Sequence, residues 1–64
     1  MTNQLVRQVQ VALQKKGYTV GPAGVDNVLG KDTRAALIKY QNDNNLPVGN
    51  LNVETLKHLG IAGY

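Results

Sequence analysis

The chain has 64 residues, no cysteine and a formal net charge of +3 at pH 7. A chain this short buries only about 60% of its unfolded surface, which excludes a deep catalytic cleft and favours a shallow surface groove. The lack of cysteine also excludes a disulfide framework and a thiolate metal site.

The sequence contains no apolar run near the roughly 20 residues that span a bilayer, so we expect no membrane partner. The first residues, Met-Thr-Asn-Gln, lack the charged and apolar regions of a signal peptide. We therefore expect no signal peptide in this chain, and an exported role would require a parent protein, a removed leader or another release route.

The positive charge is scattered along the chain, with only one adjacent pair of basic residues. The Lys and Arg side chains are Arg7, Lys15, Lys16, Lys31, Arg34, Lys39 and Lys57. Nucleic-acid-binding proteins usually cluster such residues on one face together with aromatic side chains. The pattern favours an ordinary solvated surface, and we expect no nucleic-acid partner.

Apolar residues near the N-terminus recur at helical spacing and predict a first helix that ends at Gly17. Its stripe consists of Leu5, Val6, Val9 and Leu13, and Val11 falls outside it. Thr2 or Asn3 can cap its start, because their side chains accept hydrogen bonds from free backbone N–H groups.

A second helix is expected from about residue 31 to 44, with Ala36, Leu37 and Tyr40 facing inward. Asn45 can take the left-handed backbone conformation that ends a helix, and Pro47 prevents its continuation.

A short third helix is expected from about residue 53 to 59, with Asn52 as its N-cap. Leu56 and Leu59 face inward, and Gly60 ends the helix. No segment reads as a strand, so the sequence predicts an all-α fold: a small three-helix bundle with a long, Gly-rich loop between helices 1 and 2. Residues 1–64 form one expected domain, with a core at about 4–61.

The loop from Gly17 to Gly30 is long for so small a chain, and long ordered loops tend to be functional. A short motif occurs twice after this loop. Asp32-Thr33 and Glu54-Thr55 each place an acid and a threonine in the first turn of a helix. We interpret these pairs as helix caps, because an acid there interacts favourably with the helix dipole.

Several short motifs now follow one another in a recognisable order. The chain carries V-Q at 9–10 with Leu13, G-Y at 17–18, D-N-V-L-G-K-D-T at 26–33, A-L-I-K-Y-Q at 36–41 and N-N-L-P-V at 44–48, and it finishes with Gly49, Asn52, Thr55 and Leu56. In this order and spacing the chain resembles the type 1 peptidoglycan-binding domain, a three-helix module appended to bacterial and phage cell-wall hydrolases. The resemblance covers about residues 4 to 61.

The chain departs from the family pattern in three ways. Asn27 and Asn45 stand where glycine is usual, and asparagine is the residue other than glycine that best tolerates positive φ. Leu29 replaces an aromatic residue, which removes a ring that could stack on a sugar. The loop between Val48 and Gly49 is about one residue shorter than usual.

The resemblance implies a ligand that offers hydroxyls, amides, carboxylates and apolar sugar faces. The candidate ligand-binding residues are Tyr18, Asp26, Asn27, Arg34, Tyr40 and Gln41. Most of them have a structural alternative as well.

These alternatives differ from residue to residue. Tyr40 lies on the apolar stripe and can be core, Gln41, like Gln10, can satisfy loop backbone groups, and Asp26 can organise its own turn. Arg34 is either a solvated charge or the ion-pair partner of a stem-peptide carboxylate. Tyr18 either anchors the loop or provides a surface on which a sugar can stack.

Catalysis is not supported by the residue inventory. His58 is the only histidine and shares a helix face with Glu54, which is too few ligands for a catalytic zinc site. The chain has no serine, so a serine-type triad cannot form. We expect no enzyme activity, no metal and no cofactor.

The sequence therefore favours a non-catalytic module, acting as a monomer, that attaches a cell-wall hydrolase (a phage endolysin or a bacterial autolysin) to peptidoglycan at the cell wall or outside the cell. Its expected partners are peptidoglycan, through glycan strand or stem peptide, and a tethered catalytic domain. Two alternatives are a protein-docking or prodomain-type module and a helix-turn-helix DNA-binding protein. The latter needs a turn of 3 to 4 residues before its recognition helix, and the expected connections are longer.

Overall fold

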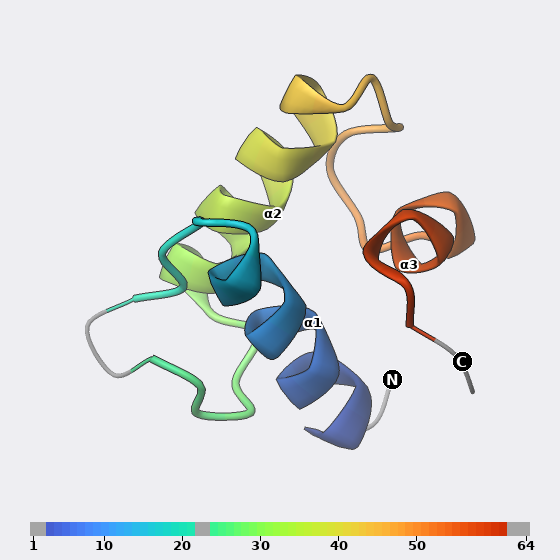
Figure 1. Cartoon of the computed structure of the whole chain (residues 1–64). Helices are drawn as coiled ribbons and strands as arrows, with labels where there is room; N and C mark the ends of the chain where they lie inside the picture. The colour runs from blue at the N-terminus through green and yellow to red at the C-terminus, as the bar shows by residue number, and fades with distance from the viewer. Residues whose placement is uncertain (1–2, 22–23, 62–64) are drawn as a thin grey trace.

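The computed structural model of the chain describes residues 3–21 and 24–61. Within these ranges there are three helices and no strand: α1 (Asn3–Lys15), α2 (Lys31–Asp43) and α3 (Val53–Leu59) (Figure 1). The predicted all-α three-helix bundle with a long loop between its first two helices is confirmed. The helix ends agree with the predicted ones to within about two residues. The predicted cap at Thr2 or Asn3 lies outside the described residues and side chains.

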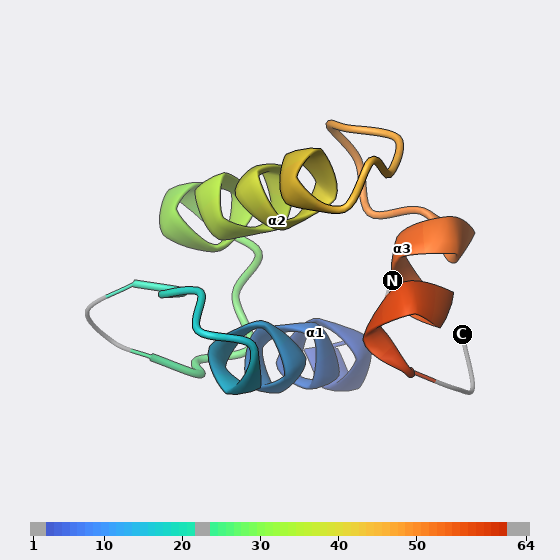
Figure 2. The same ribbon diagram turned by 45° about the horizontal axis from the view of Figure 1, so that its top comes forward.

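Helix α1 is the central element of the bundle. It packs against both α2 and α3, whereas α2 and α3 contact each other less. Figure 2 shows α2 lying above α1, with the short α3 at one end of the pair. The core comes from all three helices and from the connections that follow them.

The buried apolar side chains of this core match the predicted stripes. They are Val9, Leu13, Val20, Ala36, Leu37, Tyr40, Leu56, Leu59 and Ile61. Val6 is also buried, Leu5 packs against the core from a half-buried position, and Val11, which lies outside the predicted stripe, is half-buried. Val20 and Ile61, which follow α1 and α3, were not predicted, because single apolar residues in loops carry no periodic signal.

All three helices end in the same way. The residue just past each end has a left-handed backbone: Gly17 (φ 90°), Asn45 (φ 57°) and Gly60 (φ 80°). The N–H of the residue after it bonds to a carbonyl five residues back, as in Tyr18 to Leu13 at 2.9 Å. Leu46 to Gln41 at 2.8 Å and Ile61 to Leu56 at 3.0 Å complete the set.

This arrangement is the Schellman motif, which satisfies backbone carbonyls that the helix leaves free. In each case the residue that makes the bond (Tyr18, Leu46 or Ile61) also packs on the core. The motif therefore turns the chain back onto the bundle after each helix, and it confirms the predicted left-handed conformation of Asn45.

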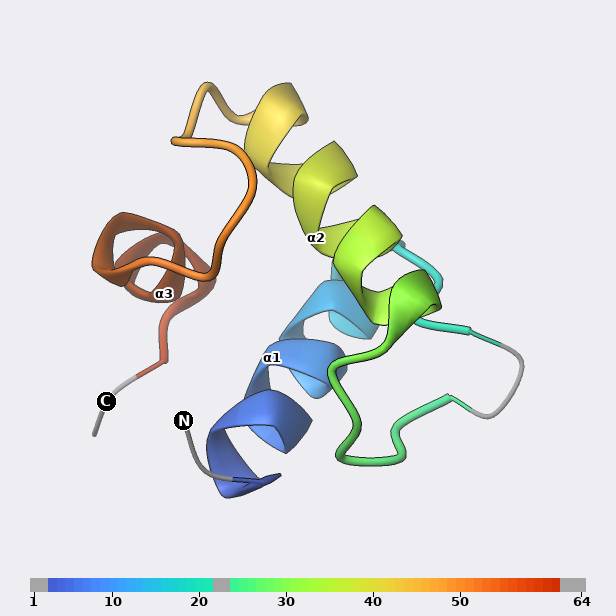
Figure 3. The ribbon, with the colours of Figure 1, turned by 180° about the vertical axis from the view of Figure 1, so that it is seen from behind.

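The loop between α1 and α2 protrudes from one side of the bundle (Figure 1). The start of α1 and the end of α3 lie together on the other side, as the reverse view in Figure 3 also shows. The loop thus lies on a different side of the molecule from the start of α1 and the end of α3.

Candidate functional site

Two buried glutamines hold the connections of the bundle in place. Gln10 of α1 is fully buried, and its carbonyl oxygen accepts the backbone N–H groups of Asp26 (3.2 Å) and Asn27 (3.0 Å). Its amide nitrogen donates to Thr33 Oγ1 (2.9 Å), the Val28 carbonyl (3.1 Å) and Asp26 Oδ1 (2.9 Å). We call this set the first glutamine clamp; it fixes the far part of the loop against α1.

Gln41 of α2 repeats the arrangement and forms the second glutamine clamp. It is fully buried, its carbonyl oxygen accepts the Gly49 N–H at 3.0 Å, and its amide nitrogen donates to Thr55 Oγ1 (3.1 Å) and the Asn50 carbonyl (2.9 Å). The Asn52 side chain accepts the Thr55 N–H at 2.8 Å, which confirms Asn52 as the N-cap of α3. In both clamps the threonine is the third residue of a helix.

The threonines are therefore more than the helix caps that the sequence suggests. Thr33 is buried, and its hydroxyl lies within hydrogen-bond distance of the Val20 carbonyl (3.3 Å) and the Val28 carbonyl (3.4 Å). It thereby touches both limbs of the α1–α2 loop. Gly30, which precedes α2, has no side chain to cap the helix. The loop is held instead by Thr33, the third residue of α2.

An open groove of about 630 Å³ lies between the first limb of this loop and α2. Its lining comes from two short stretches: Gly17, Tyr18, Thr19 and Gly21 of the loop, and Asp32, Ala35, Ala36, Lys39 and Asp43 of α2. Ligand sites commonly have volumes of about 300–1,000 Å³. A smaller hollow of about 150 Å³ adjoins it and shares Gly21 and Asp32 with it.

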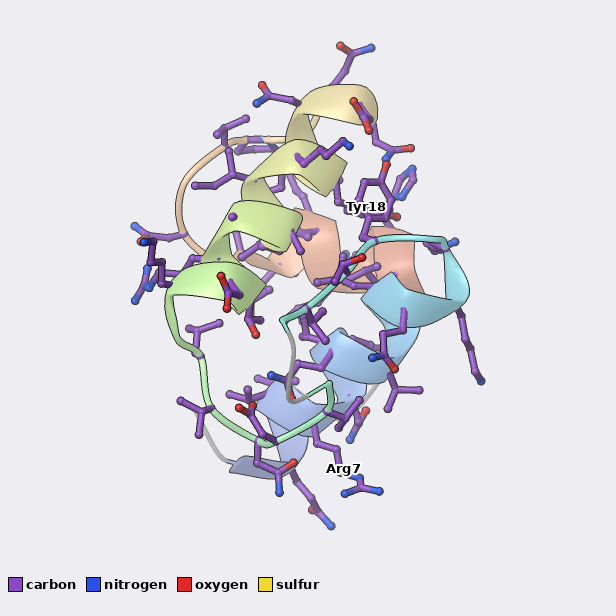
Figure 4. All side chains as sticks on the ribbon, turned by 90° about the vertical axis from the view of Figure 1, so that its left-hand side faces the viewer. Arg7 and Tyr18 are labelled. Carbon is purple, nitrogen blue, oxygen red and sulfur yellow. The ribbon has the colours of Figure 1, made fainter. Side chains whose placement is uncertain are left out.

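Tyr18 is the aromatic residue of the groove. Figure 4 shows it where the chain leaves α1, well away from Arg7 in the first half of that helix. Its ring packs edge-on against Tyr40 (centroids 5.4 Å apart), and its hydroxyl donates to Asp43 Oδ2 at 2.7 Å. The hydrogen bond to the Asp43 carboxylate raises the pKa of the Tyr18 hydroxyl above its ordinary value.

Tyr40 continues this aromatic contact into the core. It is 2% exposed, its hydroxyl is hydrogen-bonded to Nδ1 of His58, and burial raises its pKa. Asp43, Tyr18, Tyr40 and His58 therefore form one connected row from α2 to α3.

The six predicted ligand-binding residues do not come together in one place. Tyr18 lines the groove, and Asp26 lines the adjoining hollow. Asn27 follows Asp26 in the loop and is half-buried. Its φ is 64°, which confirms the positive φ predicted from its place in the family pattern. Tyr40 and Gln41 are interior side chains that already have partners within the fold.

Arg34 is exposed but lies on another face of α2. At 3.6 residues per turn it stands about 160° around the helix from the groove residue Ala36. Whether it touches a ligand stays a prediction. The sequence did not single out several groove residues as ligand contacts, above all Asp32, Lys39 and Asp43. These three residues follow one another at spacings of seven and four, so they share one face of α2.

Asp26 anchors the turn that closes the loop. Its carboxylate accepts hydrogen bonds from the Gln10 amide and from the Val28 N–H (3.0 Å). These bonds, of which the one from Gln10 has the larger effect, lower the pKa of Asp26 below the ordinary 3.8.

Among the described residues there is no group of three or more His, Cys, Asp or Glu side chains that could hold a metal ion. None of the helices in the described part of the chain is long and apolar enough to cross a membrane.

Residues 2–59 match the profile of a family described as "Putative peptidoglycan binding domain". The chain belongs to this peptidoglycan-binding family. The family is one of binding domains and not of enzymes, so membership suggests peptidoglycan as the partner and the cell wall as the setting. Comparisons with curated proteins and with solved structures gave no significant match.

The motifs that carry the family resemblance can now be assigned to structural tasks. V-Q at 9–10 and Y-Q at 40–41 supply the two glutamine clamps, and the threonines at 33 and 55 receive them. Most of the residues that make this peptidoglycan-binding domain recognisable therefore hold the loops in place. The groove is formed where the first loop lies beside α2.

Proposed function

We propose that this domain is a non-catalytic module that attaches a cell-wall hydrolase, a phage endolysin or a bacterial autolysin, to peptidoglycan. The observation that carries the proposal is the family match over residues 2–59. A module of this kind raises the local concentration of substrate for the enzyme to which it is tethered, and this gain does not require tight intrinsic binding.

The groove between residues 17–21 and α2 is the proposed ligand surface. It combines an aromatic ring, at Tyr18, with charged side chains and exposed backbone, which suits a ligand with both polar and apolar groups. The hollow at Asp26, next to Asn27, extends this surface along the same loop.

Retention of the chain on insoluble peptidoglycan tests the function. We expect the wild type to sediment with purified cell-wall material and Tyr18→Ala to be retained about tenfold less, because the aromatic surface of the groove is lost. Lys57→Ala, which removes an exposed side chain of α3 outside the groove, should be retained like the wild type.

Circular dichroism of each variant provides the control for folding. A Tyr18→Ala chain that keeps its helix content and also keeps full retention contradicts the groove as the site. A wild-type chain that stays in the supernatant contradicts peptidoglycan binding itself.

A further inference from the structure

The groove differs in charge from the rest of the molecule. The chain as a whole carries +3, but the groove is lined by two carboxylates, Asp32 and Asp43, and by one ammonium group, Lys39. These three residues lie within about 40° of one another around α2, so they form a row along one face. Along the helix axis, Asp32 and Lys39 are about 10 Å apart, and Lys39 and Asp43 about 6 Å.

Two of the three charges have no partner within the described part of the chain. Asp43 accepts the Tyr18 hydroxyl, whereas the side chains of Asp32 and Lys39 make no hydrogen bond or ion pair there. An unpaired carboxylate and an unpaired ammonium group in one groove offer complementary contacts to a ligand that carries both charges.

The backbone opposite Asp32 is shaped to leave its carboxylate at the groove surface. A Cβ added to Gly21 would come within 3.0 Å of the Asp32 Cβ and 3.1 Å of its Oδ2. Glycine at 21 therefore lets the loop lie directly against this side chain. Asp32 borders both the groove and the adjoining hollow.

Tyr18, by contrast, offers only a limited surface for a sugar. Its edge-on contact with Tyr40 and its bond to Asp43 fix the ring and use the hydroxyl. The other uncharged lining residues are glycines, alanines and a threonine, which provide no second ring for stacking.

Peptidoglycan offers two kinds of ligand to such a groove. Its glycan strands are built of N-acetylated sugars, and its short stem peptides carry free amino and carboxylate groups beside small methyl side chains. Successive residues of an extended peptide advance about 3.3–3.6 Å, so the roughly 10 Å between Asp32 and Lys39 spans about three residues, or fewer where one charge stands at the end of a long side chain such as lysine.

We propose that the groove binds the stem peptide, with Lys39 pairing with a peptide carboxylate and Asp32 with an amino group. The floor formed by Ala35 and Ala36 receives a small side chain between these two contacts. This proposal rests on the proposed function, peptidoglycan binding, and assigns that function to one chemical part of the polymer.

The test is a titration of the isotope-labelled chain followed by NMR, with two probes. One is the stem-type peptide L-Ala-γ-D-Glu-L-Lys-D-Ala, and the other is a tetramer of N-acetylglucosamine. We expect the peptide to shift the amides of residues 17–21 and 32–43 and the sugar to bind at least tenfold more weakly. Binding of the sugar alone at these amides would overturn the proposal.

Altered peptides and single substitutions identify the two charge contacts. Amidation of the peptide's terminal carboxylate should weaken binding to the wild type about fivefold but not to Lys39→Gln, because the contact is already lost there. Acetylation of the peptide's lysine should weaken binding to the wild type but not to Asp32→Asn. Equal effects on wild type and variant would overturn the assigned contact.

The chain offers a matched control for each substitution. Lys57→Gln also removes one cation, but from an exposed position on α3 outside the groove. Glu54→Gln removes an acid from the second position of α3, as Asp32→Asn does from the second position of α2. Both controls should bind the peptide like the wild type.

Sedimentation of the wild type with intact peptidoglycan separates the two proposals. Retention on the polymer without peptide binding overturns the stem-peptide assignment and leaves the function standing. No retention overturns peptidoglycan binding, and the stem-peptide assignment falls with it.

Discussion

Asn27 and Asn45 occupy left-handed backbone conformations that most side chains avoid, with φ of 64° and 57°. Both conformations could be predicted from the sequence, because asparagine stands where the family pattern has glycine and tolerates positive φ. At Asn27 the side-chain oxygen is buried and has no hydrogen-bond partner among the described residues. The reason for asparagine at position 27 is therefore its tolerance of positive φ, and not a hydrogen bond to its side-chain oxygen.

Substitution of Asn27 tests this interpretation. Asn27→Val should lower the melting temperature by about 10 °C, because a β-branched residue at positive φ costs about 1–3 kcal/mol. Asn27→Gly should melt at or above the wild-type temperature, since glycine adopts this φ freely and leaves no unpaired oxygen. Thermal unfolding followed by circular dichroism measures both, and a valine variant with an unchanged melting temperature would show that the turn has been misinterpreted.

Asp26 links the same turn to pH. Because its pKa in the folded chain lies below the ordinary 3.8, the folded state favours the ionised carboxylate. The stabilisation is present above about pH 4 and is lost as the pH falls through the lower, folded-state pKa. The difference in unfolding free energy between wild type and Asp26→Asn should therefore shrink as urea unfolding is repeated from pH 6 down to pH 3. A difference that stays constant over this range would contradict the assigned role.

At the scale of elements, two glutamines on helices organise the two connections of the bundle. The sequence revealed half of this arrangement, since the acid–threonine pairs at 32–33 and 54–55 stood out as a motif that occurs twice. It did not reveal that Gln10 and Gln41 are the partners of those threonines, because the contacts join residues 23 and 14 positions apart. Periodicity reports which face of a helix is buried, but it does not report which polar side chain a distant loop requires.

Removal of the first clamp should cost a large part of the stability of so small a fold. Gln10→Ala leaves part-buried backbone groups of the loop without their partner inside the fold, and we expect the free energy of unfolding to fall by about 3 kcal/mol. Gln8→Ala on the same helix removes an exposed glutamine and should change it by less than about 0.5 kcal/mol. Urea unfolding measures both, and equal stabilities of the two variants would show that the clamp is dispensable.

At the scale of the whole molecule, the sequence predicted the bundle well and the binding surface only in part. The helices and their inward faces follow from local periodicity and from the residues that end each helix. The groove follows instead from how the loop returns along α2, so Tyr18 was found while Asp32 and Lys39 were not singled out as ligand contacts. Their spacing of seven residues places both on one face, and this signal becomes useful only once the neighbouring loop is located.

The separation of the loop from the start of α1 and the end of α3 has a consequence for how such a domain can be joined to others. A partner domain that precedes α1 or follows α3 would be connected on the side away from the loop, so it need not crowd the groove (Figure 1). The same geometry allows several copies to follow one another on a single polypeptide, each with its loop face outward. Weak individual contacts would then add up through avidity along a polymeric wall.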